Sequence, residues 1–365
     1  MTQRTRWADV TLHYDGVDIS EDLSGDLISL TYTDNATDKA DDLSVTLEDI
    51  KGRWSGGWFP SKGATLTPAI IVHEWDGPGT SALPCGTFQI DQIECSGKPS
   101  QVTIKAVSTF PKTHMRYERA CETWESISLQ KLLEDVAGKC GLGLRFDARD
   151  RLFDVRHQME TPNLTYALAL CHDYGMGAKV VDGMLFVYDE AEYEGKGGGA
   201  TIRRDDQRIE RYQFTSKTDD TYKRARLQYH DPIKDETWTG AADDDVEGTE
   251  RVLELCDYAE SDGDAAALAK AKLHDKNKRE MTASVTVMGS FAFHATDCAT
   301  VEGFGAFDGS WFIERVTHEI GRGTGYTTKI DLRKKGKSGG GGGSKKASEP
   351  RALVYEGTDV YGRGD

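Results

Sequence analysis

The side chains best able to do chemistry lie near the C-terminus, in the stretch DGSWFIERVTHEIGRGTGYTTKIDLR (308–333). His318 is flanked there by Glu314 and Glu319, and Asp331 follows further along. A histidine among carboxylates has the composition of a metal site or of a general base. The H-E-x-x-H zinc motif does not fit, because no second histidine follows four positions after His318. A histidine packed within a β-strand is the competing interpretation.

Other combinations of reactive side chains also lack the spacing that catalysis needs. Cys171, His172 and Asp173 are adjacent, and neighbouring side chains on a helix point about 100° apart, so they cannot form a triad. No G-x-S-x-G motif occurs. The acidic loop AADDDVEGTE (241–250) lacks the D-x-D-x-D-G spacing of a calcium loop. We therefore predict that the chain is not an enzyme and has no catalytic residue, metal ligand or cofactor.

The composition limits the classes of partner. The formal net charge of the 365 residues is -16, which disfavours nucleic-acid binding by phosphate neutralisation but suits a passage through which DNA slides. No apolar run approaches the roughly 18 to 20 residues of a membrane span, and the N-terminus lacks the apolar core of a signal peptide. We expect synthesis in the cytoplasm and no membrane anchoring. The seven scattered cysteines are expected to be small buried hydrophobes.

The elements that must position these residues are mostly strands. Alternating apolar and polar residues, as in DLSVTLED (42–49), predict β-structure over residues 8–110 and again over 201–333. Residues 120–190 instead show two helical patterns, each followed by a short strand. The second β-region is interrupted by one Ala-rich helix near residues 264–280.

Two blocks of the chain repeat one another. GTFQIDQIEC (86–95) matches GSWFIERVTH (309–318) at an offset of 309 − 86 = 223, and each block precedes a glycine-containing turn and a closing strand. Upstream, LSVTLED (43–49) matches ASVTVMG (283–289) in the same order. The chain therefore contains two related β-domains.

This alignment changes the interpretation of the histidine. Cys95 occupies the place of His318, and Asp91 occupies the place of Glu314. A catalytic histidine is not expected in a duplicated frame whose twin carries cysteine. We therefore predict that His318 packs inside a sheet, and that the acid shared by both copies contacts a neighbouring domain.

A smaller repeat lies between the β-regions. LLEDVAGKCGLGLRF (132–146) matches YALALCHDYGMGAKV (166–180) at an offset of 175 − 141 = 34. In each copy a helix ends at a glycine, Gly141 or Gly175, which can adopt the left-handed conformation, and a strand follows. The helix-then-strand order excludes a dinucleotide-binding fingerprint, which needs a strand first.

The order of these blocks resembles the late control D (gpD-like) baseplate hub proteins of contractile phage tails. Relatives of that family include the hub of T4-like phages and the N-terminal part of the type VI secretion protein VgrG. The resemblance covers about residues 5–335 and rests on three stretches: DIKGRWSGGWFPSKGATLTPAII (49–71), HQMETPNLTYALALCHDYGMGAKVVDGMLFVYD (157–189) and the C-terminal strands of 308–332. Pro162 and Asn163 depart from the family, which commonly has an aspartate before this helix.

The resemblance implies a fold that is mainly β with an α+β insert, in which two related β-barrel-like tube domains flank a small α/β domain. The expected parts are a first tube-like domain (1–112), a small α/β domain (113–195), a second tube-like domain (196–335), a Gly/Lys linker (336–347) and a flexible C-terminal tail (348–365).

The resemblance also implies partners. Such proteins form homotrimers whose six tube domains make a ring that joins the hexameric tail tube to the trimeric spike protein. Baseplate wedge and tape measure proteins are further expected partners, and DNA is expected only as cargo passing through the channel. Assembly is then expected in the tail baseplate of a virion or related particle.

Candidate interface residues follow from residue type. Trp54 and Trp58 are large aromatics of the kind that dominate protein contacts. The shared acids Asp91 and Glu314 are the second pair of candidates. The third is an apolar patch of the tail that could add to a neighbour's sheet edge, made of Leu353, Val354 and Tyr355.

Two other functions remain open at the level of sequence. A surface- or carbohydrate-binding tail adhesin would need exposed aromatic clusters in clefts. A tail-associated cell-wall hydrolase would need the nucleophile or metal set that the sequence lacks.

Overall fold

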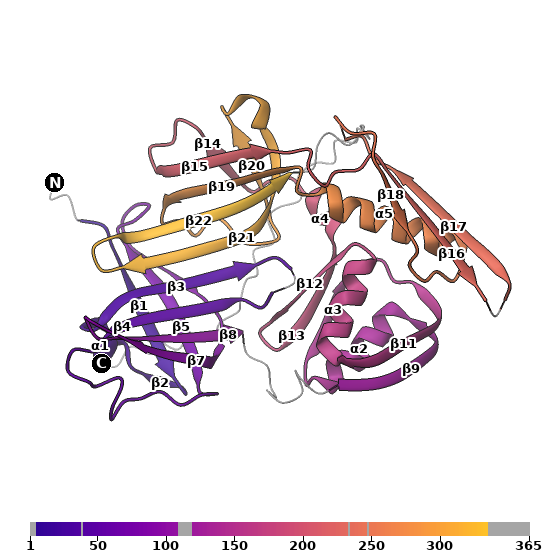
Figure 1. The fold of residues 1–365 in the computed structure, drawn as a ribbon. Coiled ribbons are helices and arrows are strands. Elements are labelled where there is room, and N and C mark those ends of the chain that lie inside the picture. The colour runs from indigo at the N-terminus through magenta and orange to yellow at the C-terminus, as the bar shows by residue number, and fades with distance from the viewer. Residues whose placement is uncertain (1–4, 38, 109–118, 233, 247, 335–365) are drawn as a thin grey trace.

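The largest element of the protein is one 14-stranded β-sheet that gathers strands from both ends of the chain (Figure 1). A unit with two helices and an insert with one long helix lie to one side of it. This computed structural model describes residues 5–37, 39–108, 119–232, 234–246 and 248–334. None of the described helices is long and apolar enough to cross a membrane.

The N-terminal part of the sheet, called the first sheet, alternates buried and exposed positions along its strands, as half-buried strands require. Its core includes the fully buried Leu12, Leu30, Leu47 and Ile70. The short helix α1 (Ser20–Ser24) follows β2. The strands are β1 (Trp7–Tyr14), β2 (Val17–Asp18), β3 (Leu27–Asn35), β4 (Asp42–Glu48), β5 (Thr65–His73), β6 (Thr80–Pro84), β7 (Phe88–Ser96) and β8 (Gln101–Ser108).

The C-terminal part, called the second sheet, has its own core, which includes Val285, Trp311, Val316 and Ile330. A 3-10 turn, Gly305–Phe307, precedes its long strand β21. The strands are β14 (Ala200–Arg203), β15 (Ile209–Ser216), β19 (Met281–Met288), β20 (Cys298–Glu302), β21 (Gly309–Gly321) and β22 (Gly325–Lys334).

The two sheets have the same topology. The first runs β3-β4-β8-β7-β5-β1 and the second runs β15-β19-β22-β21-β20-β14, so counterparts agree in both chain order and sheet order. The sheets differ in that β1 is antiparallel to β5 whereas β14 is parallel to β20, and in that β2 and β6 are added to the first sheet. The predicted relationship between two β-domains is therefore confirmed.

Neither sheet closes into a barrel among the described residues, which corrects the barrel-like expectation. The path of hydrogen-bonded strands ends at β15 on one side and at β2 on the other. In the first sheet β7 joins β5 through only two register pairs, Thr65–Gln89 and Leu66–Phe88. Closure would need a further ladder between β1 and β3, and these strands are not paired.

The two sheets are joined edge to edge. Strand β21 extends past its pairing with β20 and forms an antiparallel ladder with β3, from Arg315–Asn35 to Gly321–Ser29 (Figure 1). The two sheets thus share one path of paired strands, β15-β19-β22-β21-β3-β4-β8-β7, which continues through β5 and β1 to β2.

The small α/β unit packs two helices against a three-stranded sheet and a two-stranded ribbon. Gly141 and Gly175 follow its two helices with φ of 71° and 70°. A Cβ on Gly143 or Gly177 would lie within 2.4 Å of a side chain of β13, so glycine permits both flanking strands to approach it. The elements are β9 (Arg119–Ser128), α2 (Leu129–Lys139), β10 (Gly143–Asp147), β11 (Leu152–Pro162), α3 (Asn163–Asp173), β12 (Met176–Val181), β13 (Met184–Asp189) and α4 (Glu190–Glu194).

The residues between β15 and β19 leave the large sheet and form an insert. Three strands, β16 (Arg224–Asp231), β17 (Glu236–Asp243) and β18 (Val252–Leu255), make a separate sheet under helix α5 (Asp262–Asn277). Small residues allow the helix to lie close, since a Cβ on Gly240 would meet the α5 backbone at 2.2 Å.

Candidate functional site

The acid shared by the two repeats marks a β-bulge in each sheet. The register between β7 and β8 skips Asp91, between Ile90 and Gln92. The register between β21 and β22 skips Glu314 in the same way. A bulge leaves one residue unpaired and bends its strand, so the duplicated acid has a structural position that alternation alone does not show.

Glu314 lies at the joint between the sheets. Its backbone carbonyl accepts a hydrogen bond from the Ala36 amide at 2.9 Å, directly after the β3 ladder ends. Its carboxylate accepts from Arg279 at 2.9 Å and lies 3.2 Å from the Arg333 guanidinium. Asp91 is exposed. A role for these two acids in contacts between subunits remains a prediction.

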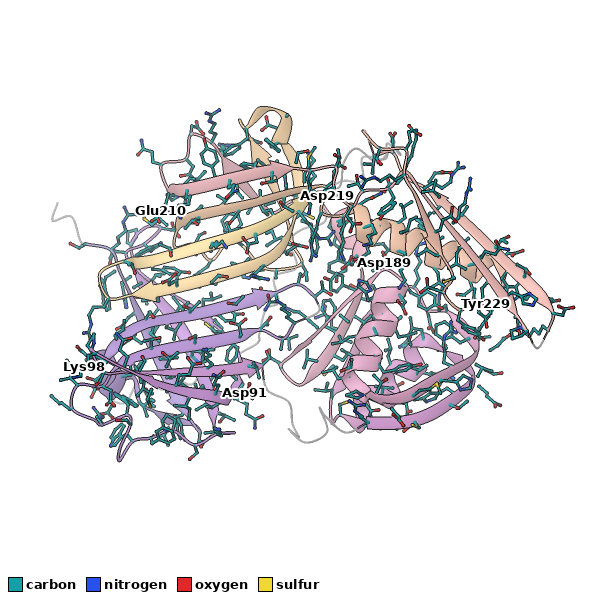
Figure 2. All side chains as sticks on the ribbon, viewed as in Figure 1. Asp91, Lys98, Asp189, Glu210, Asp219 and Tyr229 are labelled. Atoms are coloured by element: carbon teal, nitrogen blue, oxygen red, sulfur yellow. The ribbon has the colours of Figure 1, made fainter. Side chains whose placement is uncertain are left out.

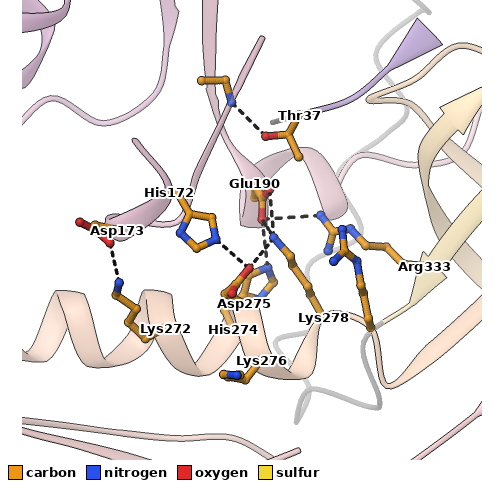
Figure 3. A network of polar contacts seen from close by, with 12 residues as sticks. Thr37, His172, Asp173, Glu190, Lys272, His274, Asp275, Lys276, Lys278 and Arg333 are labelled. Atoms are coloured by element: carbon orange, nitrogen blue, oxygen red, sulfur yellow. Dashed lines mark hydrogen bonds and ion pairs between the residues drawn. The ribbon is translucent and has the colours of Figure 1, made fainter. Parts of the chain in front are cut away.

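A buried ion cluster joins β22, α4 and α5 (Figure 3). At its centre, Arg333 is 2% exposed, forms an ion pair with Glu194, and lies 3.6 Å from Glu190. Burial acts to lower the pKa of Arg333, but the carboxylates of Glu194, Glu190 and Glu314 outweigh it and raise that pKa. The cluster therefore ties the second sheet to both neighbouring units with paired charges.

A second cation reaches the same cluster from the end of α5. The Lys278 ammonium is 3.2 Å from Glu190 and 2.7 Å from Asp275, and His172 Nε2 lies 3.1 Å from Asp275. Burial alone would raise the pKa of Asp275, but the hydrogen bond with His172 and the charge of Lys278 lower it well below its usual range. Asp275 is therefore ionised at neutral pH.

Part of this cluster offers donor atoms for a metal ion. Atoms of Glu190, Glu194 and His274 lie within 4.8 Å of one another. Arg333 and Lys278, however, already contact these carboxylates. A divalent cation would have to displace two buried cations, so the residues fit an ion-pair network better than a metal centre.

A similar ion group joins the small unit to the first sheet. The Lys179 ammonium on β12 is 2.8 Å from Asp34 and 3.7 Å from Asp41, and it also donates to the carbonyl of Asn35 at 3.0 Å. Burial raises the pKa of Asp41 to about 7, although Lys179 opposes the shift. The end of β3 is thus fixed both by the small unit and by β21.

The three adjacent residues considered as a triad point to different partners. His172 contacts Asp275, whereas Asp173 binds Lys272 at 2.5 Å. Burial raises the pKa of the Cys171 thiol to about 12, so the thiol stays protonated. This geometry cannot activate a nucleophile.

His318 is packed, as the repeat predicts. It is 2% exposed, its Nδ1 lies 2.8 Å from the Tyr326 hydroxyl, and its ring stacks on Tyr32 of β3 with centroids 5.8 Å apart. Burial lowers its pKa to about 4, which keeps it neutral at physiological pH. His318 therefore belongs to the packing between the two sheets.

The two tryptophans predicted at an interface occupy different environments. Trp54 is 3% exposed and donates its indole N–H to Asp26 at 2.8 Å, so it belongs to the core of the first sheet. Trp58 is 44% exposed and Arg53 covers one face of its ring at 3.8 Å. Phe59, the next residue, is 51% exposed. An interface role is therefore better suited to Trp58, and it remains a prediction.

Three predicted residues have no described structure, and three central residues were missed by sequence reasoning. Leu353, Val354 and Tyr355 lie outside the described residues. The alternation of GYTTKIDLR (325–333) puts Arg333 on the polar face of its strand, and nothing in the sequence signals the burial of Lys278 or Glu190. Only the meeting of α4, α5 and β22 reveals this cluster.

Comparisons with known proteins agree with the geometry. No protein-family model matches the chain. The chain is 34% identical over 120 residues to the probable baseplate hub protein of Escherichia phage 186. The match covers 33% of this chain and 28% of that protein, so it spans less than a third of the relative's length.

Solved structures extend the likeness to nearly the whole fold. The 43 kDa tail protein of prophage MuSo2 from Shewanella oneidensis superposes with a TM-score of 0.68 at 13% identity, over 90% of this chain and 98% of that one. The chain has the fold of a phage tail protein. The E. coli c3393 protein, a type VI secretion component similar to the T4 tail proteins gp27 and gp5, gives 0.52 at 10% identity, over 86% and 74%. The resemblance to baseplate hub proteins is confirmed.

Proposed function

We propose that the chain is a structural baseplate hub of a contractile injection machine, either a phage tail or a related particle. Three copies place six related sheets in a pseudo-six-fold ring. The ring joins the hexameric tail tube on one side to the trimeric spike protein on the other, and DNA passes through it as cargo.

The observation that carries this proposal is the edge-to-edge joint between two copies of one sheet. A repeated sheet that already pairs with its twin through β21 and β3 can continue the same pairing between chains. Symmetric assemblies reuse one interface in this way. The similarity to the phage 186 hub protein and to tail protein structures supports the same function.

Other features support the expected partners. A net charge of -16 suits a bore that repels DNA and keeps it mobile. Exposed Trp58 and Phe59 suit contact with the spike or with a wedge protein. The protonated Cys171 and the neutral, packed His318 favour a structural role over an enzymatic one. Arg53 covers one face of Trp58, which disfavours stacking of a sugar there.

The proposal is tested in particles. Deletion of the gene is expected to give no tails with complete baseplates, and expression of the chain in trans is expected to restore them in negative-stain micrographs. Immunogold labelling should place the chain at the tail tip. Complete, contractile tails from the deletion strain would overturn the proposal.

A further inference from the structure

We propose that strand β7 of one copy pairs antiparallel with strand β15 of a second copy, in the register that β21 uses on β3 within one chain. The inference deepens the proposed function and rests on it, because it names the contact between neighbouring copies. It is carried by four observations: two free edges, matching bulges, exposed side chains and the direction of backbone groups.

Two strand edges are free among the described residues, the outer edge of β15 and the edge of β7 after its bulge. In the part of the chain that the structure describes, β15 pairs only with β19, and from Gln92 onward β7 pairs only with β8. In Figure 2 the label Glu210 lies on β15 and the label Asp91 lies on β7, while Asp219 and Lys98 label residues shortly after the ends of these strands. Free edges present unpaired N–H and C=O groups that template pairing with another chain.

The edge of β15 is the counterpart of an edge that is occupied within the chain. The register between β3 and β4 skips Ile28, and the register between β15 and β19 skips Glu210. Aligning these bulges places Ser29 of β3 on Arg211 of β15. In β3 the positions from Ser29 to Asn35 are the ones that pair with β21.

The edge of β7 is likewise the counterpart of β21. The Gly63 amide donates to the Ile90 carbonyl, and the Thr296 amide donates to the Ile313 carbonyl, just before the bulge in each strand. Aligning these positions places Gln92 on Arg315. On the edge away from its hairpin partner, the segment after the bulge pairs with β3 in β21, whereas in β7 the same edge has no partner among the described residues.

Transfer of the β21–β3 register therefore gives a defined ladder between copies. It runs from Gln92 opposite Lys217 to Ser96, the last residue of β7, opposite Gln213. Glu94 lies opposite Thr215, as Thr317 lies opposite Thr33 within the chain.

Apolar side chains at these two edges are exposed, whereas the equivalent side chains at the internal joint are buried. Tyr212 is 45% exposed, whereas its counterpart Leu30, covered by the joint, is 0% exposed. Cys95 is exposed, whereas its counterpart His318 is buried against Tyr32. Pairing between copies would cover these positions as it does within the chain, and burial of apolar surface would stabilise the contact.

Backbone direction agrees with the same pairing. The Ala36 amide bonds the Glu314 carbonyl, so even-numbered residues of β3 point their N–H groups at β21. In β15 the Lys217 amide bonds the Glu280 carbonyl on the inner side, so the Ser216 amide points outward. One bond of the internal joint is not reproduced, because Pro99 stands at the position of Arg322, whose amide donates to Ile28, and proline has no N–H.

The contact uses two different surfaces, one from each copy. Such head-to-tail contacts close into a ring when the rotation permits, and otherwise build filaments. A ring of three copies reuses the pairing six times, alternating between internal and intermolecular joints.

The test is disulfide trapping in the full chain. Glu94→Cys and Thr215→Cys are combined in a background with Cys95, Cys121 and Cys256 changed to serine. The pair occupies a non-hydrogen-bonded site, where opposite side chains are closest. Oxidation is expected to give interchain products, with a covalent trimer at the end of the series on non-reducing gels and by mass spectrometry.

Two controls make the result specific. Thr33→Cys with Thr317→Cys is the matched internal pair and is expected to give a disulfide within one chain at similar yield. Glu94→Cys with Gln213→Cys is shifted by two residues and is expected to cross-link at least tenfold more slowly. If the 33–317 pair forms its internal disulfide while the 94–215 pair gives no interchain product, the proposal is wrong.

A second variant tests the edge without any cross-link. Ser216→Pro removes an outward N–H that bonds no strand of its own chain, and it is expected to abolish association in sedimentation experiments without a large shift in melting temperature. Ser216→Ala is its control and should associate normally. Normal association of Ser216→Pro would show that β15 is not the pairing edge. That result would leave the proposed hub function standing, because the deletion strain tests that function separately.

Discussion

Asp91 and Glu314, separated by 314 − 91 = 223 residues, are each the extra residue of a β-bulge at the same point of two equivalent strands. The duplication therefore preserves a bend in the sheet and not only a pattern of apolar residues. The surroundings of the two acids have diverged, since Glu314 binds Arg279 and Arg333 while Asp91 is exposed. A shared frame thus supports an internal joint in one copy and an open edge in the other.

Replacement of Arg333 should strongly destabilise the chain. Arg333→Met leaves Glu190 and Glu194 buried without their central cation, and loss of one partner from a buried ion cluster costs about 3 to 5 kcal/mol. Urea unfolding followed by circular dichroism measures this change. Arg149→Met is the control. It removes an exposed ion-pair partner of Glu192, which lies on α4 with Glu190 and Glu194, and the variant should unfold like the parent.

His318 should make stability depend on pH without any role in turnover. Burial lowers its pKa to about 4 from 6.5, so between these values the unfolded chain binds more protons and folding stability falls as pH drops. The free energy of unfolding therefore falls by about 3 kcal/mol as the pH drops from 6.5 to 4. His318→Phe should be less stable than the parent at pH 7, by about 1 to 3 kcal/mol, because the Tyr326 hydroxyl loses its partner.

Thermal unfolding at pH 7, 5.5 and 4 checks this prediction. The stability gap between parent and His318→Phe should narrow as pH falls. His230→Gln, at an exposed histidine, is the control. A gap that stays constant from pH 7 to pH 4 would show that His318 is not held neutral by burial.

Replacement of Trp54 should affect folding stability, whereas replacement of Trp58 should affect mainly assembly. Trp54→Ala removes a buried indole and is expected to cost about 3 to 5 kcal/mol in urea unfolding. Trp58→Ala should cost less than about 1 kcal/mol, chiefly its contact with Arg53. If Trp58 contacts a partner, its variant should fold normally yet fail to restore tails to a deletion strain, and full restoration would exclude that role.

The Glu190, Glu194 and His274 cluster should not depend on a metal ion. Arg333 and Lys278 already neutralise its carboxylates, so neither EDTA nor added zinc is expected to shift the melting temperature. Elemental analysis of the purified chain checks the same point. Stoichiometric zinc that disappears in His274→Ala would contradict this assignment.

The strands and their duplication could be predicted from the sequence because both are local patterns. Alternation along 43–47 and 283–287 specifies half-buried strands, and the glycine-aromatic-isoleucine spacing recurs at one offset. The packing of His318 followed from the same comparison, since its twin is Cys95. Each of these inferences needed only neighbouring residues and a second copy of them.

The ion cluster could not be predicted in this way. Alternation placed Arg333 with Lys329 and Asp331 on the polar face of β22, and Lys329 is indeed exposed. Arg333 is buried because α4 and α5, from other parts of the chain, cover the end of that face. The local sequence pattern is the same whether a charged residue on this face is exposed to solvent or covered by another element.

The sequence by itself determined two related sheets, the helix–glycine–strand units between them and the absence of a recognised catalytic motif. Only the tertiary structure decided that β21 pairs with β3 and that β16, β17 and β18 leave the large sheet. It also decided that, among the described residues, β15 and the part of β7 after Asp91 have a free edge. The physical reason is that every strand edge offers the same N–H and C=O groups. Which two edges meet depends on how distant segments pack, and that information is spread over the whole chain.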